Sequence, residues 1–73
     1  MDELSWQARL AKQNINILDI DDERWFYEFM YHPYPGQTKW CKTFYGTHYG
    51  RSPEAVADDL IREVAKLRRE LEK

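Results

Sequence analysis

Cysteine is nearly absent from this chain of 73 residues, which contains only Cys41. A single cysteine cannot form an internal disulfide, and no paired Cys-x-x-Cys or His-x-x-x-His motif is present to bind zinc. The core of so short a domain usually supplies only ~3–5 kcal/mol of stability. Its stability therefore has to come from dense apolar packing or from a partner. A lone thiol is typical of a reducing compartment, so we expect a cytoplasmic protein.

Long apolar runs and an excess of positive charge are also missing. No stretch of the sequence approaches the roughly 20 apolar residues of a membrane span. The start of the chain, residues 1–4, lacks the basic and then apolar layout of a signal peptide. The formal net charge is −2, so no overall positive field attracts nucleic acid. We expect one small domain, residues 1–73, that does not enter a membrane.

Aromatic residues are abundant, and all of them except Trp6 lie between Trp25 and Tyr49. Most of them fall into two runs, Arg24–Tyr31 and Trp40–Tyr45, separated by a segment rich in proline and glycine. A helix over the first run is the alternative, because some of its apolar residues have helical spacing. The preponderance of Trp, Phe and Tyr favours strands instead. We predict an antiparallel hairpin with its loop at residues 33–38.

The register of this hairpin decides which side chains share a face. Symmetry about Pro35-Gly36 predicts the pairs Tyr31 with Trp40, Phe29 with Lys42, and Tyr27 with Phe44. These side chains and Trp25 then lie on one face, and the other face carries Phe26, Glu28, Met30, Cys41, Thr43 and Tyr45. A slip of one residue would exchange the two faces. Neither face is plainly polar, so both need a cover.

The segment before the hairpin contains weaker signals. Residues Asp2 to about Gln13 are predicted to form a short helix, which Asp2 could cap and Asn14 could end. Residues 14–20 are rich in β-branched side chains and are predicted to form a short strand or an extended connector. An acidic turn follows at residues 19–23.

The end of the chain carries the clearest helix signal. Ser52 is a good N-cap, Pro53 suits the first helical position, and apolar residues with a spacing of three or four follow to about Leu71. Asp58 with Arg62, and Lys66 with Glu70, have the spacing of favourable ion pairs. We expect the end near Arg68 and Arg69 to extend beyond the hairpin, where Val64–Leu71 could pair with a partner helix or a second copy. Gly46 and Gly50 should loosen the chain between strand and helix.

The fold class that follows is α+β. It comprises an N-terminal helix, a short extended segment, an aromatic-rich antiparallel β-hairpin of two or three strands, and a long C-terminal helix packed on it.

Residue types that carry out chemistry are few. Cys41 and His48 differ in strand parity, and His32 falls in the loop region, so no nucleophile is placed beside a base. A calcium loop counted from Asp19 would need Gly and Glu where Arg24 and Met30 stand. We expect no catalytic residues, no metal site and no cofactor.

Large aromatic area on two faces indicates binding. We predict a small non-enzymatic protein-binding module, an adaptor or inhibitor of the kind that phages and mobile elements encode, whose partner is another protein or a second copy. The candidate partner-binding residues are Arg24, Tyr27, Tyr31, Tyr34, Trp40 and Tyr45. The alternative is a single-stranded nucleic-acid-binding protein that stacks bases on the same rings and uses scattered Lys and Arg.

Overall fold

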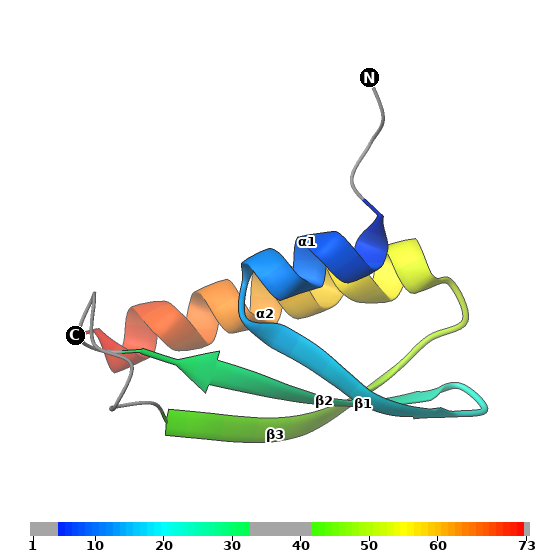
Figure 1. Ribbon diagram of the computed structural model, residues 1–73, viewed down its shortest axis with the longest axis horizontal. Helices are drawn as coiled ribbons and strands as arrows, with labels where there is room; N and C mark the ends of the chain where they lie inside the picture. Colours follow the sequence, from blue (N-terminus) through cyan, green and yellow to red (C-terminus); the bar gives the residue numbers. More distant parts are fainter. Residues whose placement is uncertain (1–4, 33–41, 73) are drawn as a thin grey trace.

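The computed structural model describes residues 5–32 and 42–72. The order of elements is α1 (Trp6–Lys12), β1 (Ile15–Asp21), β2 (Arg24–Tyr31), β3 (Lys42–Tyr49) and α2 (Pro53–Leu71). The three strands form one antiparallel sheet in the order β1-β2-β3. Both helices lie on the same face of this sheet, and nothing in the described ranges covers the other face (Figure 1). The predicted α+β fold is confirmed.

Helix α1 begins later than the sequence indicates. The side chain of Ser5 accepts a hydrogen bond from the Ala8 N–H at 3.2 Å, so Ser5 and not Asp2 is the N-cap. The helix ends at Lys12, and Asn14 has a φ of 61°. Asparagine tolerates this left-handed conformation better than most residues, and it turns the chain directly into β1.

The acidic run ends in the tight turn between β1 and β2, which consists of Asp22 and Glu23, whereas Asp19 and Asp21 lie in β1. Asp21 pairs with Arg24, so only two residues connect the strands, and Asp22 has the positive φ of 61° that such turns require. Residues 15–21 form a true strand, with a bulge where the register shifts between Ile17 and Asp19.

The predicted pairing of β2 with β3 is wrong by two residues. Tyr31 pairs with Lys42, Phe29 with Phe44, and Tyr27 with Gly46. Because side chains alternate with a period of two, this shift leaves each residue on its predicted face. The aromatic segment 24–31 is a strand, as predicted. The expected loop at residues 33–38, Trp40 and Cys41 lie outside the described residues.

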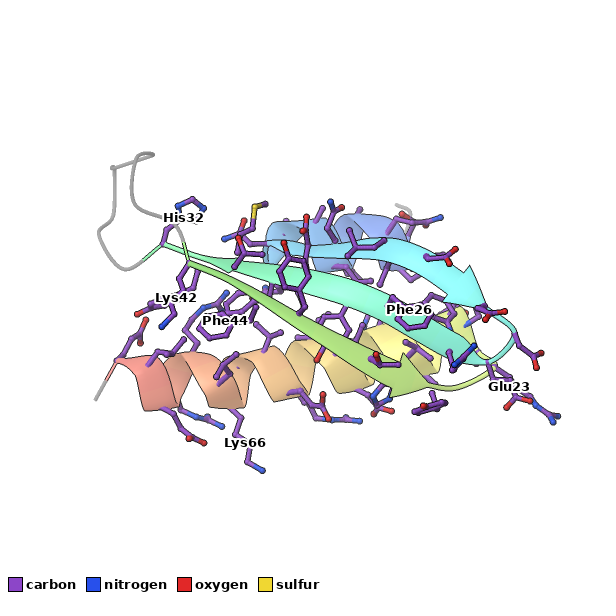
Figure 2. All side chains as sticks on the ribbon, turned by 90° about the horizontal axis from the view of Figure 1, so that it is seen from below. Glu23, Phe26, His32, Lys42, Phe44 and Lys66 are labelled. Atoms are coloured by element: carbon purple, nitrogen blue, oxygen red, sulfur yellow. The ribbon has the colours of Figure 1, made fainter. Side chains whose placement is uncertain are left out.

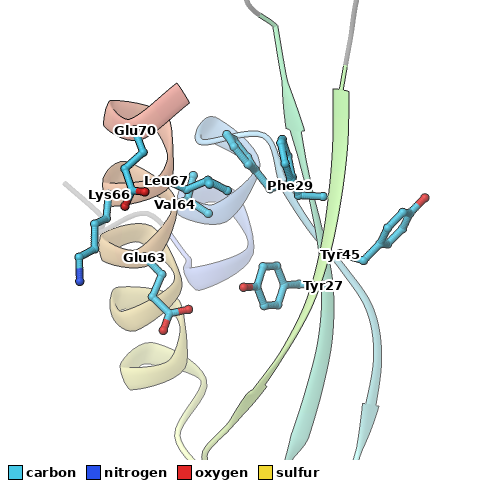
Figure 3. A pocket seen from close by; sticks show the side chains of 9 residues that line it. Tyr27, Phe29, Tyr45, Glu63, Val64, Lys66, Leu67 and Glu70 are labelled. Carbon is cyan, nitrogen blue, oxygen red and sulfur yellow. The ribbon is translucent and has the colours of Figure 1, made fainter. Parts of the chain in front are cut away.

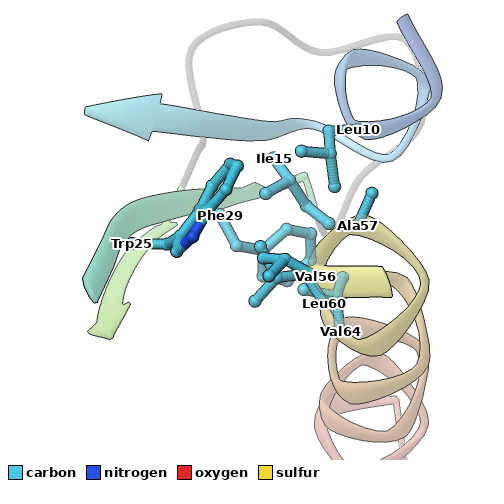
Figure 4. Close-up of a cluster of buried hydrophobic side chains, with 8 residues drawn as sticks. All are labelled: Leu10, Ile15, Trp25, Phe29, Val56, Ala57, Leu60 and Val64. Atoms are coloured by element: carbon cyan, nitrogen blue, oxygen red, sulfur yellow. The ribbon is translucent and has the colours of Figure 1, made fainter. Parts of the chain in front are cut away.

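The hydrophobic core lies between the helices and the first two strands (Figure 4). Its eight buried side chains are Leu10, Ile15, Trp25, Phe29, Val56, Ala57, Leu60 and Val64. Trp25 also donates a hydrogen bond from Nε1 to the Gly50 carbonyl at 2.9 Å, which attaches the end of β3 to the centre of the sheet. Strand β3 contributes only the partly buried Phe44 to this packing.

Helix α2 has the predicted bounds and the predicted cap at Ser52, but its side-chain partners differ. Asp58 pairs with Arg9 of α1 instead of Arg62, which pairs with Asp59. No ion pair between Lys66 and Glu70 is found in the part of the chain that the structure describes.

The end of α2 is attached to the rest of the fold through Arg68. The Arg68 guanidinium lies 5.2 Å from the ring centroid of Phe29, and it donates hydrogen bonds to the side chain and carbonyl of Gln13. Val64 is buried and Leu67 packs against the core, so the apolar side of α2 faces the sheet.

Candidate functional site

The open face of the sheet carries large apolar side chains that the helices do not cover. Leu18 is 52% exposed, Tyr45 is 72% exposed and Tyr49 is 66% exposed. Figure 2 views the molecule from below the sheet of Figure 1, and Phe26 is labelled there on β2. A shallow hollow of about 260 Å³ crosses all three strands on this side and is lined by Leu18, Phe26, Tyr27, Tyr45, Gly46 and Thr47. We call it the open-face hollow.

Two charged side chains on the face that carries the open-face hollow have partners within the chain. Arg24 lies over the ring of Phe26, 5.6 Å from its centroid, and pairs with Asp21 at 2.5 Å. Glu28 accepts a hydrogen bond from the Asn16 amide at 3.2 Å. An apolar centre with a polar rim is the usual anatomy of a protein–protein interface.

A second and deeper hollow lies on the helix side of the sheet, between β3 and α2 (Figure 3). Its volume is about 400 Å³, and we call it the β3–α2 groove. Apolar side chains line its interior, and charged side chains line the side formed by α2. The lining residues are Tyr27, Phe29, Phe44, Tyr45, Glu63, Val64, Lys66, Leu67 and Glu70. Tyr27 reaches toward α2, whereas Tyr45 extends from the opposite side of the sheet.

Gly46 determines how Tyr27 is placed. It is a residue within β3, not a link after it, and it pairs directly with Tyr27 on β2. A Cβ atom on Gly46 would lie 2.6 Å from the Tyr27 hydroxyl and 2.7 Å from its Cζ. The absence of a side chain therefore lets the tyrosine ring lie across β3, and both residues line the open-face hollow. Tyr27 and Tyr45 line both hollows.

The environment of Tyr27 keeps its hydroxyl protonated. Burial raises the pKa of Tyr27 above its ordinary value of 10.0, and the negative charge of Glu63 raises it further. The hydroxyl therefore stays a neutral hydrogen-bonding group in the β3–α2 groove at physiological pH.

A small polar network joins β3 to α2. His48 Nε2 lies 3.2 Å from Asp59 Oδ2, and Arg62 donates to the other oxygen of the same carboxylate. The hydrogen bond from Arg62, followed by that from His48, lowers the pKa of Asp59 below its usual value. These contacts attach the C-terminal end of β3 to α2.

The candidate residues named from the sequence lie on both faces of the sheet. Arg24 and Tyr45 are exposed on the open face. Tyr27 and Tyr31 are partly buried on the helix side and pack against the core. Tyr34 and Trp40 lie outside the described residues. Of the described candidates, Tyr27 and Tyr45 line both hollows, whereas Arg24 and Tyr31 line neither.

Several residues of these surfaces were not named as binding residues from the sequence. Strand parity places Phe26 beside Tyr45, and alternation from Ile15 places Leu18 on the same face, so both could have been included. Glu63 and Leu67 could not, because their position depends on how α2 crosses the sheet.

Two structural findings concern the described ranges 5–32 and 42–72. No group of three or more His, Cys, Asp or Glu side chains there is arranged to hold a metal ion. Neither α1 nor α2 is long and apolar enough to cross a membrane.

Comparisons with protein-family models, curated proteins and solved structures found no match to this chain. Its function is therefore inferred from the geometry of its own residues.

Proposed function

We propose that the protein is a cytoplasmic, non-enzymatic protein-binding module that contacts its partner through the open face of the sheet, around Tyr45. The observation that carries this proposal is the exposure of Leu18 and Tyr45 on a sheet face that both helices leave open. An antiparallel sheet with one open face normally presents polar side chains there. Apolar patches with a polar rim mark interaction sites.

The residue types at this face suit a binding hot spot. Tyrosine and arginine are among the residues that contribute most to protein interfaces. Tyr45 presents a rigid ring with few rotatable bonds, so ordering it on binding costs little conformational entropy. Phe26 beside it is held in place by Arg24, so this part of the surface is formed before a partner arrives.

Electrostatics favour a protein partner over single-stranded nucleic acid. Four arginines already form ion pairs within the chain, namely Arg9 with Asp58, Arg24 with Asp21, Arg51 with Glu23, and Arg62 with Asp59. Base stacking by exposed rings needs an accompanying basic groove that follows the phosphates. Among the described residues of the open face, Arg24 already pairs with Asp21 and the acidic Glu28 shares the same face, so the rings lack that groove.

Site-specific photo-cross-linking tests the proposal. A benzophenone amino acid replaces Tyr45 in cells that naturally produce the protein, and Arg69, which is exposed on α2, is replaced in a control. We expect a discrete protein adduct from position 45 and none from position 69. Absence of an adduct at position 45, or equal labelling at both positions, would refute the proposal. A nuclease-sensitive adduct would instead support the nucleic-acid alternative.

A further inference from the structure

The two edges of the sheet are protected to different degrees. Strand β1 has a bulge between Ile17 and Asp19 and carries acidic side chains, which discourage pairing with another chain. Strand β3 has eight residues, contains no proline and pairs with β2 without any register shift. Among the described residues no strand lies on its outer side. β3 therefore presents a regular row of main-chain donors and acceptors.

The β3–α2 groove runs beside this edge. A strand added to a sheet lies about 4.8 Å from its neighbour, and its side chains point alternately to the two faces. Side chains that point to the helix side would enter the groove against Phe44 and Leu67. Those that point the other way would reach the exposed ring of Tyr45 and the open-face hollow. Both faces of an added strand would thus meet apolar side chains.

The charged side of the groove constrains the chemistry of this strand. Glu63 and Glu70 supply two carboxylates, and Lys66 between them supplies one ammonium group. The balance is acidic, so basic side chains on either side of an apolar one complement it. The hydroxyl of Tyr27 adds a neutral hydrogen-bonding group at the end of the groove near Glu63.

We propose that β3 receives an extended segment of the partner protein as a fourth strand, with apolar side chains in the β3–α2 groove and flanking Lys or Arg side chains facing Glu63 and Glu70. This mode of binding, in which main-chain hydrogen bonds supply affinity and a groove beside the edge supplies specificity, is a recurring form of peptide recognition. The inference rests on the proposed protein-binding function and specifies the form of the partner.

N-methylated peptides provide the test. The probe is a fluorescein-labelled peptide as long as β3, in which Leu or Val alternates with Lys or Thr, and binding is followed by fluorescence anisotropy. Two derivatives carry N-methyl groups on complementary alternate amides, so that in an added strand one set faces β3 and the other faces solvent. We expect one derivative to bind at least about tenfold more weakly and the other to bind like the parent.

Charge reversal on the protein tests the groove. The variant E63K/E70K should weaken binding of the basic probe at least about tenfold, while a probe with Glu in place of Lys should gain affinity. The matched control D19K/E72K has the same net charge but alters exposed residues that do not line the groove. It should bind within about twofold of the wild type.

Three outcomes would overturn strand addition. They are equal binding of both N-methylated derivatives, an equal loss of probe binding in E63K/E70K and in the control D19K/E72K, and no binding of the parent probe at millimolar concentration. Sizing by light scattering tests whether a second copy of the chain occupies the edge instead. A dimer in which the β3 amides are protected would mean that it does. In each case a cross-link from position 45 would still support the proposed function, so the two failures are distinguishable.

Discussion

Gly46 offers the sharpest test of the structure, because its role depends on one neighbouring side chain. It lies within β3 opposite Tyr27, and its φ is outside the left-handed region, so the backbone itself does not require glycine. The requirement comes from the tyrosine, since a Cβ would meet its hydroxyl at 2.6 Å and its ring at 2.7 and 2.9 Å. Gly46→Ala should therefore displace the ring of Tyr27.

The sign of the effect should depend on residue 27. Overpacking typically costs about 1–3 kcal/mol, and replacing a strand glycine with alanine returns about 0.5–1 kcal/mol. With the middle of each range, the net effect of Gly46→Ala is a loss of roughly 1 kcal/mol in the free energy of unfolding. With Tyr27→Val already present the collision is gone, and the same change should stabilise the fold by about 0.5 kcal/mol.

Urea unfolding followed by tryptophan fluorescence measures these differences. For a small domain the free energy falls by about 1 kcal/mol per molar urea, so Gly46→Ala should lower the midpoint by roughly 1 M or more. Comparison of the single and double variants isolates the coupling between the two positions. If Gly46→Ala shifts the midpoint equally and in the same direction with either residue at position 27, the assigned contact is wrong.

Three further predictions concern single side chains. Trp25→Phe removes the hydrogen bond to Gly50 and part of a buried ring, and should lower the unfolding free energy by about 1–3 kcal/mol in urea titrations. Glu63→Gln should bring the pKa of Tyr27 closer to 10 in an ultraviolet titration without restoring it, because burial is the larger cause; an unchanged titration would argue against their proximity. Because that pKa is raised, stability should fall as pH rises above about 10. The pKa of Asp59 is lowered, so its interactions with Arg62 and His48 stabilise the fold above about pH 4 and are lost at lower pH. Asp59→Asn should therefore reduce the acid sensitivity of unfolding. A pH profile of stability identical to that of the wild type would contradict this.

Features encoded by neighbouring residues were predictable from the sequence. The bounds of α2 follow from Ser52, Pro53 and the apolar spacing, all of which act within the helix itself. The strand at residues 24–31 follows from residue type, although the spacing of some of its apolar residues also fitted a helix. The division of side chains between the faces of β2 and β3 survived a register error of two residues, because it depends only on parity.

Features set by distant residues were not predictable. The register depends on the length of the connection between Tyr31 and Lys42, which turn residues alone do not determine. The attachment of the end of α2 was not predicted, because Arg68 finds its partners, Gln13 and Phe29, far away in the sequence. Asp58 likewise prefers Arg9 of α1 to a neighbour on its own helix.

The candidate site shows the same division. The sequence identified aromatic residues in excess of what one core requires, but not which face the helices would cover. Tyr27 and Tyr31 have the parity of buried Trp25 and Phe29, and both helices lie on that side. Tyr45 has the opposite parity and is therefore left exposed. The direction in which the helices pack thus decides which of the rings is available to a partner.

The most direct test of the central claim is the affinity of Tyr45→Ala for the protein cross-linked at position 45, measured by calorimetry. The account predicts a loss of at least about 2 kcal/mol in binding free energy, or roughly thirtyfold, with the urea midpoint unchanged because this side chain is 72% exposed. Arg69→Ala, the matched control on α2, should bind like the wild type. Unchanged affinity of Tyr45→Ala would contradict the assignment of the open face as the binding surface.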